Sequence, residues 1–164
     1  MASGHTLEGK TLSIALLLRP LAIFSGALLA VTAALVAISQ IVDLPGGSAL
    51  GVVTLIAATM PAGQSFYKAN QRRATFGEKL TFALLATLIA AAMNLATLYA
   101  VMAYFQIPFT FANVMTLFQV PAQDQALFLN IVLIVGLGIT FLGTYLMFWA
   151  AIRGAEKQAA KAKR

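Results

Sequence analysis

The sequence predicts an all-α membrane protein, a bundle of four transmembrane helices with both termini in the cytoplasm. Three observations predict it. Hydrophobic residues make up 60% of the 164-residue chain and charged residues only 10%. The charges separate long apolar runs, and the basic residues lie in alternate connections. A soluble domain needs a charged content of about 25%, so lipid must be the solvent for much of this chain.

The uncharged runs set the number of predicted helices. They cover residues 20–42, 44–67, 80–123 and 125–152. A helix needs about 20 apolar residues to cross the hydrocarbon core, so three of these runs supply one crossing each. The apolar region of a cleaved signal peptide has about 7–15 residues, and the first run is longer. We therefore expect the first helix not to be cleaved.

The run 80–123 is too long for one crossing and contains Pro108 and Pro121. Proline lacks the amide hydrogen and disfavours helical backbone in the residue before it. The third helix is therefore expected to end near Phe105, with a connection after it. We predict a single domain, 1–164, with helices at about 14–41, 48–67, 79–105 and 125–153 and a basic tail at 154–164.

The basic residues predict the orientation, because lysine and arginine are retained on the cytoplasmic side. All eleven lie in the N-terminal segment, the second connection or the C-terminal segment, and none lies in 43–47 or 106–124. We therefore expect a multi-pass protein of the bacterial inner membrane with both termini cytoplasmic. The residues expected to hold this topology and to meet lipid headgroups are Lys68, Arg72, Arg73, Lys79, Arg153, Lys157 and Lys161.

The net charge of +6 follows from this topology. Basic residues near a membrane surface attract anionic headgroups, each by about 1 kcal/mol. The C-terminal tail has no aromatic side chain among its charges that would stack on a base. The expected partners are therefore the lipid bilayer and anionic lipid headgroups, and not nucleic acid.

Small residues on two predicted helices indicate close helix packing. Gly47 and Gly51 form a GxxxG pattern in the second helix, and Gly136 and Thr140 share a face of the fourth. Small residues let helix backbones approach closely in membranes. The GxxxG pattern favours packing within the chain, while a contact between copies and a chance occurrence are the alternatives.

Two prolines lie in or beside the predicted spans. Pro20 either lies in the first turn of the first helix or separates a short interfacial helix from the span. Pro61 leaves a carbonyl of the second helix without its donor, which predicts a kink or a short unwound stretch at residues 60–63. Such breaks shape binding sites in transporters, although most are only structural.

A polar stripe follows the third predicted helix. Thr87, Asn94 and Thr97 recur at helical spacing within an otherwise apolar segment. Hydrogen bonding between helices explains such a stripe, at about 0.6–2 kcal/mol in membranes. The functional alternative is a ligand or pore contact, which would include Gln64 near the Pro61 kink.

Two connections carry local signals. Thr75 and Glu78 fit a capping box, in which the threonine accepts from the amide three residues on and the glutamate reaches back. Residues 106–124 are too apolar for a free loop and lack a basic face. We expect a short helix at about 110–118 in the outer headgroup region. A re-entrant segment and a docking patch for a partner are the alternatives.

The second helix and the connection after it resemble a known family. The residues that carry the resemblance lie within 45–80 and are Gly47-Ser-Ala, Met60-Pro-Ala-Gly63, Phe66, Arg73, Ala74-Thr75 and Glu78-Lys79. This short and moderately specific motif is similar to that of the uncharacterised ABZJ-type family of small four-helix bacterial inner-membrane proteins. No activity is established for that family, so the resemblance implies a fold and leaves function open.

Missing chemistry restricts the function. The chain has no cysteine, its single histidine is His5, and no ionisable residue lies in the middle of a predicted span. Ion and proton coupling usually need ionisable groups within the membrane. The sequence also offers no metal-ligand cluster and no nucleophile–base constellation. We therefore expect neither an enzyme nor a cofactor.

Two functional hypotheses follow. The first is an accessory or scaffold protein, or a subunit of a larger membrane complex or homo-oligomer, acting by helix packing and by contacts to protein or lipid. The second is an oligomeric small-solute transporter or channel lined by the polar stripe and Gln64 near Pro61. A pathway requires these side chains to converge on a wet cavity. An accessory protein buries them or presents its unpaired surface to a partner.

Overall fold

The computed structural model describes residues 8–39 and 48–162, and every regular element in these two ranges is a helix. The prediction of an all-α fold is confirmed. The GxxxG residue Gly47 and the turn before it lie outside the described residues. The long helices are α1 (Glu8–Ser39), α2 (Ser48–Asn70), α3 (Phe76–Tyr104) and α6 (Leu137–Ala162), and the short ones are α4 (Phe111–Leu117) and α5 (Gln125–Ile131).

Three of the helical segments are long and apolar enough to cross a membrane. They are Ile14–Ile38 in α1, Phe76–Tyr104, and the continuous helix Ala122–Ala162. α2 is not among them, because polar residues, a proline and a glycine in its second half lower its mean hydropathy. These residues are Thr59, Pro61, Gly63, Gln64 and Ser65. Length and composition of these three helices thus indicate a membrane protein.

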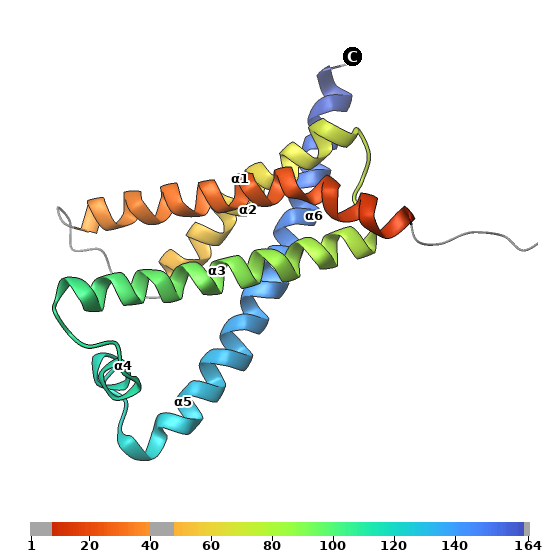
Figure 1. Ribbon diagram of the computed structural model, residues 1–164. Coiled ribbons are helices and arrows are strands. Elements are labelled where there is room, and N and C mark those ends of the chain that lie inside the picture. Colours follow the sequence, from red (N-terminus) through yellow and green to blue (C-terminus); the bar gives the residue numbers. More distant parts are fainter. Residues whose placement is uncertain (1–7, 40–47, 163–164) are drawn as a thin grey trace, which may run out of the picture.

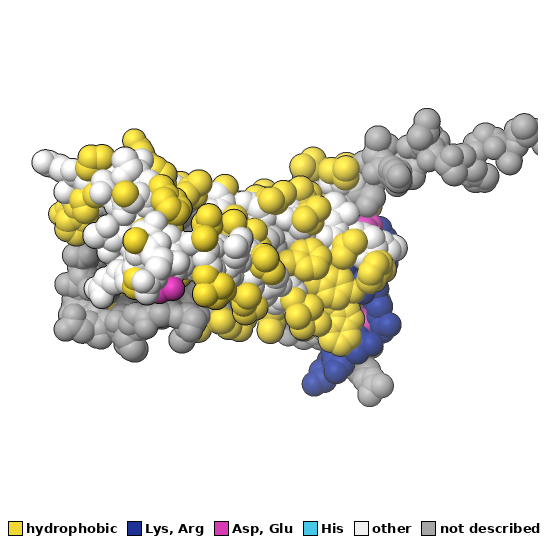
Figure 2. All heavy atoms as spheres, turned by 90° about the horizontal axis from the view of Figure 1, so that it is seen from below, with side chains coloured by type: hydrophobic (Ala, Val, Ile, Leu, Met, Phe, Trp, Pro, Cys, Tyr) yellow, Lys and Arg dark blue, Asp and Glu magenta, His cyan; other side chains and the backbone are white. Residues whose placement is uncertain are grey.

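The long helices form one bundle. α1 and α3 lie side by side and run the same way, whereas α2 runs back obliquely and α6 crosses them at a steep angle (Figure 1). α2 packs against α1 and α6, and α3 packs against the same two helices. This arrangement brings the end of α2, the start of α3 and the end of α6 together. Lysine and arginine side chains gather at one end of the molecule, beside a broad hydrophobic face (Figure 2).

Four phenylalanines hold the bundle together, one from each long helix. Phe24, Phe66, Phe82 and Phe148 are fully buried. The Phe82 and Phe148 rings stack with centroids 3.9 Å apart. Phe24 meets Phe82 edge-on at 6.0 Å, and Phe66 meets Phe148 edge-on at 5.8 Å. Aromatic pairs contribute about 0.5–1.5 kcal/mol each beyond their burial, so this cluster fixes all four helices in one place.

Neither helix-internal proline breaks its helix. α1 begins at Glu8 and continues through Pro20, which is fully buried. Pro20 therefore neither starts the helix nor separates a short one from it. α2 is helical through Pro61, so the predicted unwound stretch at 60–63 is wrong. The physical reason is packing: Ala62 and Gly63 are buried, and their contacts with neighbouring helices keep the backbone helical.

The connection after α3 folds into a short helix, α4. Thr110 is its N-cap and accepts from the Asn113 amide at 3.3 Å. α3 and α4 both end with a glutamine at positive φ, Gln106 at 58° and Gln119 at 55°. The next amides bond back to the helix, Ile107 N to Met102 O and Val120 N to Met115 O, at 2.9 and 3.0 Å. These are Schellman endings in which glutamine takes the usual glycine position.

The last helix is much longer than a membrane crossing. α5, the π-helical turn η2 (Val132–Gly136) and α6 follow one another without a break. Together with the 3-10 turn η1 (Ala122–Asp124) before α5, they make the segment Ala122–Ala162 of 41 residues. This segment is about 60 Å long, against about 30 Å for the hydrocarbon core. Its second half belongs to the bundle, while α5 extends away from it (Figure 1). We call residues 125–139 the arm.

Candidate functional site

The residues predicted to line a pathway lie in different environments. Asn94 and Thr97 are exposed, and the Thr97 hydroxyl donates to the Met93 carbonyl at 2.9 Å. Thr87 is buried, and its hydroxyl has no hydrogen-bond partner. Gln64 is half-buried on another helix, as is Pro61. In the described structure these side chains therefore do not share one environment.

The expected hydrogen bond between helices at Asn94 does not form within the described chain, where no hydrogen bond of its side chain is found. An amide in an apolar helix needs a partner, because an unsatisfied polar group in hydrocarbon is costly. The exposed Asn94 amide therefore needs a hydrogen-bond partner from outside the described chain. The buried Thr87 hydroxyl is the other polar group of the stripe without a partner.

Close helix packing occurs at glycines other than the predicted ones. Among the described residues nothing lies within 4 Å of the Cβ position at Gly51 or Gly136, so the expected close packing is not found there for either glycine. The physical reason is that both glycines lie on exposed faces of their helices. The close approaches are instead at Gly63, against α6, and at Gly143, whose Cβ position is 3.1 Å from Leu55 Cδ2. Gly63 lies in the segment 60–63, where Pro61 predicts a kink or a short unwound stretch.

One face of the last helix packs in its second half and is open in its first. Thr144, Phe148, Ala151, Ile152 and Ala155 are buried against the bundle. The same face continues at i−4 steps to Thr140, which is half-buried, and to Gly136, which is exposed. The Thr140 hydroxyl donates to the Gly136 carbonyl at 2.8 Å, so it bonds back to the preceding turn of its own helix.

The arm has little cover from the rest of the described chain, apart from the contact of Phe128 with Phe118. Neither α5 nor η2 contains a buried residue. Its apolar side chains are broadly exposed, Ile134 most of all at 74%. Besides Gly136 it presents Gly138, also with nothing within 4 Å of its Cβ position, and the exposed amide of Asn130. The arm thus offers small residues, one amide and apolar side chains to whatever surrounds it.

At the basic end, an ion pair joins the connection after α2 to the first turn of α3. The Arg72 guanidinium donates to both Glu78 oxygens, at 2.9 and 2.6 Å. Glu78 is buried, and it also accepts from the Thr75 amide at 2.7 Å, while Thr75 Oγ1 accepts from the Glu78 amide at 3.3 Å. Both hydrogen bonds of the capping box are present. The hydrogen bonds to Glu78 raise the pKa of Arg72 above its usual range.

A second ion pair links this connection to the last helix. Arg73 donates to Glu156 through Nε and Nη2 at 2.8 and 3.0 Å. Two further cations at this end lie over aromatic rings. Lys79 Nζ is 5.5 Å from the Tyr145 ring centroid, and the Arg153 guanidinium carbon is 4.4 Å from that of Trp149. The remaining basic residues of the predicted set, Lys68, Lys157 and Lys161, are exposed.

The pair between Arg73 and Glu156 was missed by the sequence analysis, because the residues are 83 positions apart. Nothing local in the sequence signals it. In the described part of the chain, no group of three histidine or acidic residues is placed to hold a metal ion.

No protein-family model matches the chain, and no curated protein or solved structure shows significant similarity to it. The resemblance of residues 45–80 to the ABZJ-type family therefore stays a prediction. The function has to be argued from the geometry of the arm, the polar residues and the basic end.

Proposed function

We propose that the protein is a non-catalytic accessory subunit of a bacterial inner-membrane assembly, with four crossings and both termini in the cytoplasm. The three apolar helices support membrane insertion. The fourth crossing is α2, which packs between α1 and α6 and runs against the direction of α1. The meeting of basic residues at one end supports a single cytoplasmic face, because positive residues remain on that side. α4 then lies at the outer surface.

The single observation that carries the accessory function is the uncovered arm. The face of α6 that packs on the bundle at Thr144 continues to Gly136 with nothing packed on it. Membrane helices associate through small residues that allow close approach and through polar side chains that hydrogen-bond across the interface. Gly136, Gly138 and Asn130 provide both on one segment. We therefore propose that the arm packs against a transmembrane helix of another membrane protein.

α4 supports the same orientation. The Phe109 ring contacts Tyr99 at 5.6 Å, and Phe118 contacts Phe128 at 5.7 Å, so α4 is attached to both α3 and α5. Phe111 and Leu117 are exposed. Exposed aromatic residues beside a membrane helix suit the interface, which supports the proposal that α4 lies in the outer headgroup layer.

No observation favours the alternative of a small-solute pathway. It would need Thr87, Asn94, Thr97 and Gln64 to face a shared space, and they differ in burial and in the helices that carry them. A pathway built by several copies would place Asn94 at a contact between copies. The mass of the intact particle distinguishes these cases.

The test is the composition of the particle extracted from native membranes in mild detergent. We expect the wild-type chain to purify with a second membrane protein at fixed stoichiometry. Gly136→Leu fills the open face, so it should remove the companion without unfolding the chain. Gly26→Leu is the matched control, because Gly26 is also an exposed helix glycine with nothing within 4 Å of its Cβ position. A companion that is retained in Gly136→Leu, or a lone monomer, contradicts the proposal.

A further inference from the structure

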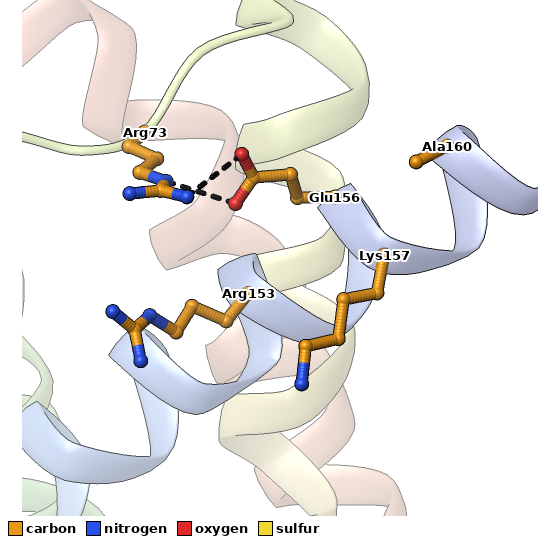
Figure 3. A pocket seen from close by; sticks show the side chains of 5 residues that line it. All are labelled: Arg73, Arg153, Glu156, Lys157 and Ala160. Atoms are coloured by element: carbon orange, nitrogen blue, oxygen red, sulfur yellow. Dashed lines mark hydrogen bonds and ion pairs between the residues drawn. The ribbon is translucent and has the colours of Figure 1, made fainter.

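The basic end contains an open pocket between the α2–α3 connection and the last helix. Its volume is about 320 Å³, and it is lined by Arg73, Arg153, Glu156, Lys157 and Ala160 (Figure 3). Four of these residues come from α6 at positions i, i+3, i+4 and i+7, which share one helix face. Arg73 comes from the connection and closes the pocket from the side.

The charges in the pocket leave an excess of positive charge. Glu156 is the only acid among the five lining residues, and both of its oxygens accept from Arg73. Arg153 and Lys157 form no ion pair with a described carboxylate. In Figure 3 the charged ends of Arg153 and Lys157 extend away from the Arg73–Glu156 pair. The pocket therefore presents one guanidinium paired with Glu156 and two further cations that form no ion pair with a described carboxylate.

The position of Trp149 relates the pocket to the membrane surface. The Arg153 guanidinium lies over the Trp149 ring at 4.4 Å. Tryptophan side chains collect at the boundary between hydrocarbon and headgroups, and Arg153 follows Trp149 by one helical turn. Given the proposed orientation, on which this inference rests, Arg153 and Lys157 lie at the level of lipid phosphates.

An apolar track leads from the hydrocarbon side to the pocket. Leu142, Leu146 and Trp149 are exposed and precede Arg153 at steps of four, three and four residues. Such spacing places them on one face of the helix, in line with Arg153. A free phosphate has no apolar part that could contact this track. A phospholipid would place an acyl chain along it while its phosphate reaches the cations.

We infer that this pocket binds the phosphate of an anionic phospholipid, whose acyl chain follows Leu142, Leu146 and Trp149. Arg153 and Lys157 bind the phosphate oxygens, and guanidinium and ammonium groups both suit this task. Arg73 pairs with Glu156 and forms one side of the site. Headgroups without net charge are bound less well, because they bring their own cation into a positive pocket.

The test is lipid binding to the purified chain in neutral detergent, followed by native mass spectrometry or by quenching of the single Trp149. The probes are short-chain phosphatidylglycerol, phosphatidylcholine of the same chain length, and inorganic phosphate. Arg153→Gln with Lys157→Gln removes the free cations. Lys68→Gln with Lys161→Gln is the matched control, since it removes the same charge at the same end from exposed residues outside the pocket.

We expect the wild type and the control to bind phosphatidylglycerol with similar affinity, and the pocket variant to bind it at least about tenfold more weakly. Leu146→Gln should weaken lipid binding as well. Equal losses in the pocket and control variants would mean diffuse charge attraction and overturn the inference. Equal binding of inorganic phosphate, or of phosphatidylcholine, would also overturn it. The arm takes no part in this assay, so its failure leaves the accessory function untouched.

Discussion

A Cβ atom placed on Gly63 of α2 would lie 2.6 Å from the Cβ of Ala151 in α6 and 3.0 Å from the Phe148 carbonyl oxygen. No side chain fits in that space. The two helices therefore meet with backbone almost against backbone, next to the Phe66–Phe148 contact. Among the described glycines, Gly63 has the closest neighbours.

Replacing Gly63 should accordingly destabilise the bundle. Gly63→Ala forces α2 and α6 apart, and overpacking of this kind costs about 1–3 kcal/mol. Gly51→Ala is the control, because it adds the same methyl group to the same helix in open space, and alanine favours helix over glycine. Thermal unfolding in detergent should show a lower midpoint for Gly63→Ala only. Equal midpoints would mean that α2 and α6 do not meet at this glycine.

Loss of Arg72 should destabilise the start of α3. Glu78 has only 5% of its side chain exposed, so Arg72→Gln leaves a buried carboxylate with hydrogen bonds from Thr75 alone. We expect a loss of about 1–3 kcal/mol. Arg73→Gln removes a pair whose arginine is 64% exposed, and it should cost less. If unfolding in detergent ranks the two variants in the opposite order, the role assigned to the Arg72–Glu78 pair is wrong.

Thr87→Val should not destabilise the protein. The Thr87 hydroxyl is buried without a partner, and a methyl group of similar size removes its desolvation cost, a gain of up to about 1 kcal/mol. In Thr144→Val the lost hydroxyl donates to the Thr140 carbonyl at 2.7 Å, so no such gain is expected. A marked loss of stability in Thr87→Val would show that the hydroxyl has a partner in the folded protein.

Cysteine labelling tests the number of crossings, because the chain has no cysteine of its own. In intact cells, a membrane-impermeant maleimide should label Ala122→Cys, while Ala2→Cys and Lys161→Cys react only after permeabilisation. An even number of crossings places residues 2 and 161 on the same side. If α2 did not cross, these two positions would label from opposite sides.

The all-helical class was predictable because it depends on composition and on the spacing of charges. The capping box depends on two residues three positions apart, Thr75 and Glu78, so a local pattern is enough. The endings of α3 and α4 were not predictable, since Gln106 and Gln119 occupy a left-handed position where glycine is the usual signal.

Contacts between distant segments could not be predicted from the sequence. Gly51 and Gly63 are both glycines of α2, and only the crossing with α6 distinguishes the open one from the packed one. The pair between Arg73 and Glu156 also depends on that crossing. The exposure of the arm could not be predicted either. An apolar helix has the same sequence pattern whether lipid, its own bundle or a partner covers it.

Photo-crosslinking from the arm tests the central claim, which is that a helix of another membrane protein covers it. The photoreactive residue benzoylphenylalanine is placed at position 134, the most exposed apolar position of the arm, and for comparison at position 29 of α1, where Leu29 is 60% exposed. Irradiation of native membranes should give one adduct of fixed mass from position 134 and none from position 29. Lipid adducts alone from both positions would contradict the account.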